Sequence, residues 1–251
     1  MGYIIAIDQG TTSTRTIIFD SQFAIMGQGQ EEFEQHFPKS GWVEHNPHDL
    51  LNTVITTCKK ALNDGKIRAN EILALGITNQ RETTLLWDKV TGEPIYNAIV
   101  WQDRRTSKFC DELRRAGLEK LVTSVTGLLL DPYFSATKLK WLMDNVEGAR
   151  TKAEAGRLLF GTVDTYLIWH LTKGRVHATD ATNASRTMLY DINKGEWSTE
   201  ICEMLNIPMS TLPEVRNCSD DFGVCDEKIL GHKIPIKGVA GDQHAATIGQ
   251  A

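Results

Sequence analysis

The order of strand and helix signals in the first 80 residues constrains this chain more strongly than any other feature. Three runs with strand character, Tyr3–Asp8, Thr14–Asp20 and Ala24–Phe33, follow one another with short connections and predict a β-meander. A helix that ends at Gly65 comes next, and the apolar run Ile72–Thr78 follows it. A strand reached through a helix pairs parallel to an earlier strand. The order therefore predicts an α/β fold with a mixed central sheet flanked by helices.

Later segments extend this pattern. The turn TGEP at 91–94 separates two strand-like runs, 84–88 and 95–101, and predicts a hairpin. Apolar residues at helical spacing predict helices at 105–115, 139–146, 163–171 and 196–205. A last strand at 234–240 leads through Gly241 into a further helix.

Composition excludes several classes of protein. The 251 residues are 41% hydrophobic and 24% charged, as in ordinary globular domains. A formal net charge of −5 argues against nucleic acid as a partner, and no apolar run reaches the roughly 18 residues of a membrane helix. Five scattered cysteines and a start without a secretory signal predict reduced thiols in a cytoplasmic protein. His36, His45 and His48 lie on a loop with Pro and Gly, so we expect them at the solvated surface.

The stretch DQGTTSTR, residues 8–15, is the first candidate for chemistry. A strand delivers Asp8 to its tip, and the chain then turns at Gly10. Backbone N–H groups in such a turn bind anions, and hydroxyl groups add donors for phosphate oxygens. The acid can hold Mg²⁺ directly or through water. The pattern therefore predicts a phosphate site, with a polar hairpin turn as the alternative.

A second candidate is the pair Arg81 and Glu82, which follows the predicted strand 72–78. The carboxyl ends of strands are where open α/β sheets place ligands. The pair offers a donor fork beside an acceptor, which suits neighbouring hydroxyl groups of a polyol. The alternative is an exposed ion pair without function.

Two further candidates also lie at strand ends. Trp101 ends the run 95–101, and an indole beside polar groups suits the apolar face of a small polyol. The alternative is an aromatic residue at the edge of the core, before a helix capped by Asp103. Asp242 stands at a strand-to-helix turn, where a carboxylate accepts a proton from a substrate hydroxyl or caps the helix.

In this order the four groups resemble the motifs of the FGGY family of carbohydrate kinases, in the actin/Hsp70-like ATPase superfamily, and of its glycerol kinases in particular. DQGTTSTR resembles the family's first phosphate motif, and GITNQRETTLLWDKVTGEPIYNAIVWQDRR at 76–105 is similar to a glycerol kinase hallmark. YFSATKLKWLMDN at 133–145 fits the family pattern Y-x-[ST]-x-x-K-[apolar]-x-W-[apolar], and AGDQHAA at 240–246 fits the motif that carries the catalytic base. The resemblance spans the whole chain and implies a ribonuclease H-like, actin-like ATPase domain.

The resemblance also implies an activity, the transfer of the γ-phosphate of ATP to glycerol in the presence of Mg²⁺. Asp242 would be the catalytic base at the primary hydroxyl, and Asp8 would hold Mg²⁺. The residues implied in glycerol binding are Arg81, Glu82, Trp101, Tyr133, Asp242 and Gln243. The residues implied at the ATP phosphates are Thr11, Thr12, Ser13 and Arg15.

The extent of the chain departs from the family pattern. Residues 244–251 read as a helix just begun, without a C-cap, whereas family members have two similar domains around a cleft. We therefore expect 1–251 to be one N-terminal, glycerol-binding domain without its nucleotide-binding partner domain and inactive alone. We expect the full-length enzyme to be a homo-oligomer. The alternatives are a related kinase for xylulose, gluconate or ribulose, and a non-catalytic actin-like nucleotide-binding module.

Overall fold

The computed structural model describes residues 2–251 and is built around a six-stranded sheet with the order β13-β14-β5-β1-β2-β3. The strands are β1 (Tyr3–Gln9), β2 (Ser13–Phe19), β3 (Ile25–Glu32), β5 (Ile72–Asn79), β13 (Val224–Cys225) and β14 (Ile234–Gly241). β1, β2 and β3 pair antiparallel, as the predicted meander. β5 pairs parallel to β1, and β14 pairs parallel to β5. The predicted α/β class with a mixed sheet is therefore confirmed.

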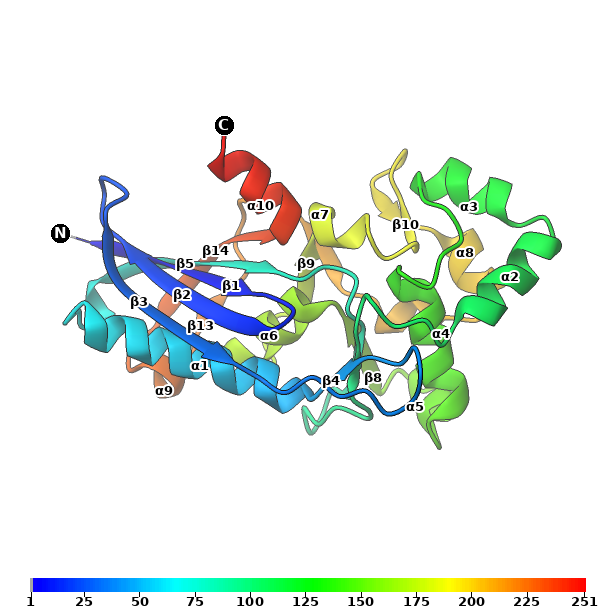
Figure 1. The fold of residues 1–251 in the computed structure, drawn as a ribbon, viewed down its shortest axis with the longest axis horizontal. Coiled ribbons are helices and arrows are strands. Elements are labelled where there is room, and N and C mark those ends of the chain that lie inside the picture. Colours follow the sequence, from blue (N-terminus) through cyan, green and yellow to red (C-terminus); the bar gives the residue numbers. More distant parts are fainter. Residues whose placement is uncertain (1) are drawn as a thin grey trace.

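Helices cover one face of this sheet. α1 (Pro47–Asp64) packs along β2 and β3 and contacts α6 (Val163–Leu171) and α9 (Glu227–Leu230). Figure 1 shows α1 and α9 on one side of the sheet and α10 (Asp242–Gly249) on the other. β1 alternates accordingly, because Ile5 and Ile7 are buried while Asp8 is exposed. The strand therefore presents Asp8 on the face away from α1.

A second hydrophobic core lies beside the first, towards the right of Figure 1. It is built by α2 (Ser107–Arg115), α3 (Glu119–Thr126), α4 (Ser135–Asn145), α5 (Ala149–Glu154) and α8 (Thr199–Met204). The antiparallel pair of β6 (Leu85–Asp88) and β8 (Leu158–Gly161) joins the two cores. Leu85 and Trp87 belong to the first core and Leu86 to the second, because successive strand residues point to opposite faces.

Short elements complete the fold. They are β4 (Glu44–His45), η1 (Ala69–Glu71), β7 (Ala98–Ile99), β9 (Ala178–Asp180), α7 (Ala181–Ala184), β10 (Tyr190–Asp191), β11 (Glu196–Trp197), η2 (Met209–Thr211) and β12 (Glu214–Arg216). The helix predicted at 196–205 begins too early, since Glu196–Trp197 pairs with β10 and Ser198 caps α8 instead. The predicted hairpin around 91–94 keeps its bridges Thr84–Ile99 and Trp87–Pro94, but only β6 and the two-residue β7 count as strands.

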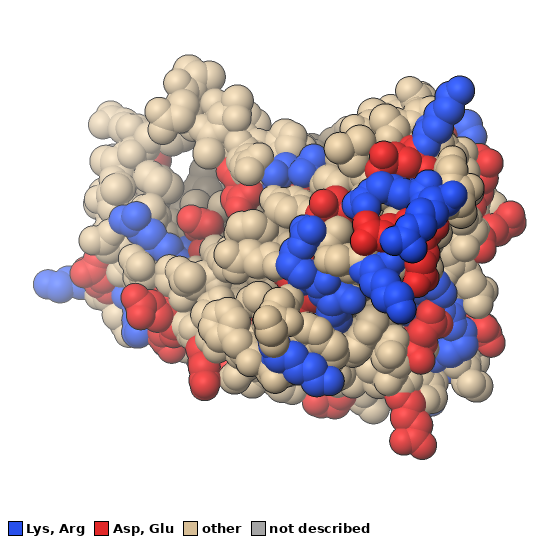
Figure 2. All heavy atoms as spheres, turned by 45° about the vertical axis from the view of Figure 1, so that its right-hand side comes forward, with Lys and Arg blue, Asp and Glu red and all other residues tan. Residues whose placement is uncertain are grey.

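No helix among residues 2–251 has the length and apolar character needed to cross a membrane. All five cysteines are free thiols, and only Cys218 is not fully buried. The face in Figure 2 carries lysine and arginine side chains interspersed with aspartate and glutamate, and its upper edge is hollowed between the part that bears α10 and the right-hand part.

Candidate active site

The register of three parallel strands brings the predicted site segments together. Gln9 of β1 lies beside Asn79 of β5, and Asn79 lies beside Gly241 of β14. The chain leaves all three strands at this edge, so the turn at 10–13, the segment 80–82 and the start of α10 converge there. This is the sheet edge at which open α/β folds bind ligands.

Gln80 connects the first two of these segments. Its backbone N–H donates to the carbonyl of Gln9 at 2.9 Å. Its side-chain amide donates to Oε1 of Gln9 at 3.1 Å and to the carbonyl of Gly10 at 3.0 Å. Because Gln80 is buried, these bonds hold the turn after β1 at a fixed place beside Arg81.

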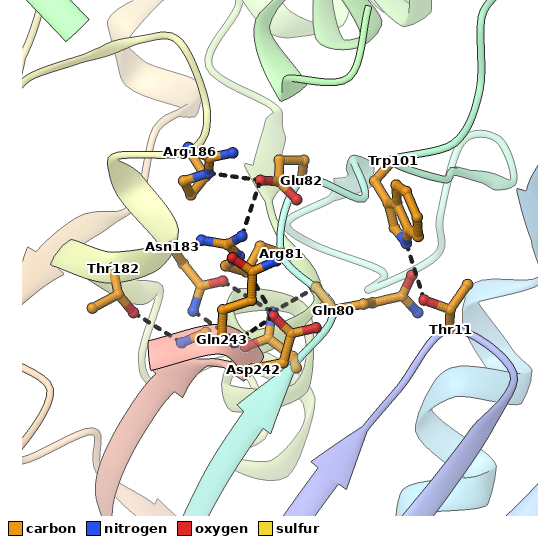
Figure 3. A network of polar contacts seen from close by, with 12 residues as sticks. Thr11, Gln80, Arg81, Glu82, Trp101, Thr182, Asn183, Arg186, Asp242 and Gln243 are labelled. Carbon is orange, nitrogen blue, oxygen red and sulfur yellow. Dashed lines mark hydrogen bonds and ion pairs between the residues drawn. The ribbon is translucent and has the colours of Figure 1, made fainter. Parts of the chain in front are cut away.

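Arg81 and Glu82 are not an exposed ion pair. Arg81 is 5% exposed and Glu82 is 1% exposed. Oε1 of Glu82 lies 3.9 Å from Nη2 of Arg81 and accepts a hydrogen bond from Nε of Arg186 at 2.8 Å. Nε of Arg81 lies 3.4 Å from Oδ1 of Asp242 (Figure 3). Two arginines thus alternate with two carboxylates along the site, and the two buried groups, Arg81 and Glu82, each have an oppositely charged partner.

The backbone of Glu82 is also fixed by hydrogen bonds from α4. Its carbonyl oxygen accepts from the hydroxyl of Ser135 at 3.1 Å and from Nζ of Lys138 at 3.2 Å. Lys138 donates to the carbonyl of Tyr133 as well, at 2.6 Å. Lys138 is fully buried, and this burial lowers its pKa to about 7. One amine of α4 therefore joins the segments of Glu82 and Tyr133.

Trp101 lies between the turn at 10–13 and Tyr133. Its indole N–H donates to the hydroxyl of Thr11 at 3.0 Å, and its ring centroid lies 5.4 Å from that of Tyr133. Burial, followed by the negative charge of Glu82, raises the pKa of the Tyr133 hydroxyl. The predicted N-cap at Asp103 is wrong, because Asp103 is buried against Arg105 and the N-cap of α2 is Thr106.

Asp8 faces the same edge as Asp242. Desolvation raises the pKa of the Asp8 carboxyl, the negative charge of Asp242 raises it further, and Arg15 acts in the opposite direction. Arg15 is opposite Asp8 in the antiparallel register of β1 and β2, and it also donates to Gln28 at 3.2 Å. The two carboxylates repel each other, so a bound cation is favoured near them.

Within residues 2–251, no three histidine, cysteine, aspartate or glutamate side chains lie together as a ready-made metal site. Mg²⁺ does not require such a cluster, since it binds through one or two carboxylates together with water and substrate phosphates. Asp8, beside Asp242, therefore fits the magnesium ligand implied by the family resemblance.

The turn after β1 is compact. The N–H of Gly10 donates to the carbonyl of Ser13 at 3.0 Å, which closes the turn, and β2 begins at Ser13. Thr12 is exposed, while Thr11 and Ser13 are half-buried. The three hydroxyl residues thus lie in the turn that follows Asp8, at the sheet edge described above.

Asp242 opens α10 as its first residue, and Gly241 is the N-cap. The carboxylate of Asp242 is 46% exposed, and its Oδ1 accepts from the N–H of Gln243 at 2.7 Å. A Cβ at Gly241 would lie 2.5 Å from Cδ of Arg81, so a larger residue there would displace the Arg81 side chain. Gln243 is exposed at the start of the helix.

Three residues beside the site had no local sequence signal: Arg186 contacts Glu82, Thr182 contacts Gly241, and Asn183 contacts Asn79. Lys138, which also contacts Glu82, is the lysine of the pattern at 133–145. The expectation of a solvated His45 is wrong, because this side chain is fully buried and lies beside Gln35 and Gln80. Burial lowers the pKa of His45 to about 4.

A family model described as the FGGY family of carbohydrate kinases, N-terminal domain, matches residues 3–249. The chain therefore belongs to the FGGY family of carbohydrate kinases. Two curated relatives named glycerol kinase are similar to it: that of Chelativorans sp. (strain BNC1) is 62% identical and that of Rhizobium meliloti (strain 1021) is 61% identical, each over 250 residues. Each match covers all of this chain and 50% of the relative. The chain thus spans about half the length of the curated relatives it matches.

Solved structures of carbohydrate kinases are also similar to this chain. The crystal structure of Plasmodium falciparum glycerol kinase with ADP is similar with a TM-score of 0.94 and 37% identity, over 100% of this chain and 50% of that one. Gluconate kinase from Lactobacillus acidophilus has a TM-score of 0.89 at 22% identity, over 99% of this chain and 49% of that one, which is a likeness of fold alone.

Proposed function

We propose that residues 1–251 form the N-terminal, glycerol-binding domain of an ATP-dependent glycerol kinase. The enzyme would transfer the γ-phosphate of ATP to glycerol and release sn-glycerol 3-phosphate and ADP. One observation carries the proposal: the ends of β1, β5 and β14 bring Asp8, the pair Arg81 and Glu82, and Asp242 to one edge of the sheet. The 61–62% identity to proteins named glycerol kinase favours glycerol over other polyols.

Glycerol binding is assigned to the buried charges. Arg81 supplies donors to glycerol hydroxyls, and Glu82 supplies an acceptor. Both arginines approach Oε1 of Glu82, so within residues 2–251 Oε2 has no hydrogen-bond partner and can accept from a substrate hydroxyl. Tyr133 and Gln243 contribute further polar contacts, and Trp101 packs on the carbon chain.

Asp242 is assigned as the general base. Its Oδ1 is engaged by Arg81 and by the N–H of Gln243, whereas Oδ2 has no partner among the described residues. Oδ2 is therefore able to accept the proton of the primary hydroxyl as its oxygen attacks the γ-phosphorus. Reactions of this kind depend on positioning and on neutralisation of charge, which the fixed strand ends supply.

The phosphates of ATP are assigned to the turn after β1, with Thr11, Thr12, Ser13 and Arg15 as the groups around them. Mg²⁺ held by Asp8, directly or through water, would neutralise charge on the phosphates. The complete enzyme would contain a second domain that binds the nucleotide, and it would act as a homo-oligomer. The five free thiols, four of them buried, support a reducing, cytoplasmic compartment.

The test uses the full-length protein with glycerol, xylulose, gluconate and ribulose as substrates. We expect the highest kcat/KM with glycerol. Asp242→Asn should lower kcat by about 10² or more and change the glycerol KM by less than about tenfold, as loss of a positioned base does. Asp111→Asn, at an exposed position of α2, serves as the matched control. A near-normal kcat in Asp242→Asn would remove this residue from the role of base.

A further inference from the structure

α7 connects the ends of the two strands that carry the substrate and base residues. The hydroxyl oxygen of Thr182 accepts a hydrogen bond of 2.8 Å from the N–H of Gly241, the residue before Asp242. Asn183 exchanges two hydrogen bonds, of 3.0 and 3.1 Å, with Asn79 at the end of β5. Figure 3 shows Thr182 and Asn183 reaching from α7 towards these strand ends. One short helix thus links the strand before Arg81 to the strand before Asp242.

The two side chains of α7 are themselves fixed by Asp180, which is fully buried. Oδ2 of Asp180 accepts from the N–H of Thr182 at 2.8 Å and from its hydroxyl at 2.5 Å. Oδ1 accepts from the N–H of Asn183 at 3.2 Å and from its side-chain amide at 2.7 Å. Because the Thr182 hydroxyl donates to Asp180, its lone pairs are directed to Gly241.

The direction of the Asp242 carboxylate depends on this backbone position. β14 ends at Gly241, and α10 begins at the next residue. The carboxylate is 46% exposed, and its contact with Arg81 is long at 3.4 Å, so side-chain contacts alone do not fix it. Gly241 is confined on one side by Thr182 and on another by Arg81, whose Cδ would lie 2.5 Å from an added Cβ.

We propose that Thr182 is a positioning residue for Asp242: its hydroxyl fixes the backbone at Gly241 and so sets where the carboxylate meets the substrate hydroxyl. The inference rests on the proposed function, because it takes Asp242 as the base. A misplacement of about 1 Å costs a catalyst about 10²-fold in rate. Removal of the hydroxyl leaves the buried N–H of Gly241 without its acceptor, so the strand end moves to find another.

The test compares kcat and KM of the full-length protein with Thr182→Val and Thr182→Ser. Valine keeps the branched shape without an acceptor, whereas serine keeps the hydroxyl. We expect Thr182→Val to lower kcat by about tenfold or more with an ATP KM within about threefold of wild type. Thr182→Ser should keep kcat within about threefold. This split, with rescue by serine, distinguishes positioning of the base from general destabilisation.

Thr172→Val is the matched control. Thr172 is a fully buried threonine at the end of α6. α6 packs with α1, on the face of the sheet opposite to α10. Its hydroxyl accepts from the N–H of Val176 at 3.2 Å and donates to the carbonyl of Trp169 at 3.2 Å. This variant therefore loses the same kind of buried hydrogen bonds, and we expect its kcat to stay near that of wild type.

A Thr182→Val kcat equal to that of wild type, or no lower than that of Thr172→Val, would overturn the proposal. If Thr182→Val does not fold, Thr182→Cys, which replaces the oxygen by a weaker acceptor, is judged by the same criterion. If the wild type phosphorylates another polyol instead of glycerol, the proposed substrate is wrong. The ratio of the Thr182→Val kcat to the wild-type kcat on that polyol then tests the positioning role of Thr182. A wild type without any kinase activity overturns both the proposed function and the positioning role.

Discussion

The amine of Lys138 contributes a pH dependence that belongs to one residue. Burial lowers its pKa to about 7, and the negative charges of Glu82, Asp103 and Asp131 oppose this shift. In the unfolded chain the pKa of a lysine is about 10.4. Between these two values the unfolded chain binds one proton more than the folded protein. The free energy of unfolding therefore rises with pH from about 7 to about 10.

We expect Lys138→Met to remove this contribution. Relative to the variant, the free energy of unfolding of the wild type should rise by about 1.4 kcal/mol for each pH unit from about pH 7 to 10. Urea unfolding at pH 7, 8 and 9 measures this difference. Lys120→Met, at an exposed position of α3, should give no such trend. A difference between Lys138→Met and wild type that is independent of pH would contradict the low pKa.

At the scale of elements, α1 and β3 approach so closely that β3 has no room for a side chain at Gly27 or Gly29. A Cβ on Gly29 would lie 2.5 Å from the carbonyl oxygen of Thr57, and one on Gly27 would lie 2.3 Å from that of Ala61. These oxygens belong to the helix backbone, so they cannot rotate away. On the neighbouring strand β2, the hydroxyl of Thr16 lies 2.8 Å from that of Thr57.

Gly29→Ala should therefore push α1 away from β3. We expect it to lower the free energy of unfolding by about 1–3 kcal/mol, which is the usual cost of overpacking. Chemical denaturation measures the change. Gly249→Ala is the matched control, because no heavy atom lies within 4 Å of an added Cβ there. A Gly29→Ala protein as stable as the control would mean that α1 and β3 are further apart.

At the scale of the whole molecule, the assigned site occupies the edge of one sheet. The related glycerol kinases are about twice as long as this chain. We expect residues 1–251 to fold alone, since they contain their own cores. They should show no turnover with ATP, Mg²⁺ and glycerol. Closure of a second domain would align the phosphate with the hydroxyl, and this alignment is worth up to about 7–11 kcal/mol.

A coupled ADP-release assay on purified 1–251 tests this expectation. The same assay with a separately expressed remainder of the full-length protein is the companion experiment. Activity that appears only on mixing supports a site shared between two domains. Robust turnover by 1–251 alone contradicts it. Glycerol-dependent thermal stabilisation of 1–251 would locate polyol binding on this domain, where Arg81 and Glu82 lie.

The amino-acid sequence by itself determined the main sheet and the ends of its strands. The apolar runs of β1, β5 and β14 and the glycine at 65 that ends α1 are local signals, and each of these elements forms where it was predicted. The same signals placed Asp8 at a strand end and Asp242 directly after one. That these ends meet at one edge follows from the parallel pairing of β1, β5 and β14 in the structure.

Only the tertiary structure decided what surrounds those ends. Arg186 reaches Glu82 across 104 positions of sequence, and Lys138 reaches it across 56. His45 is buried although its loop has the composition of a surface segment. Local periodicity states which face of an element is apolar, but it does not state which distant element covers that face. Burial, pKa and ion pairing depend on that covering partner, so they follow from the assembled fold.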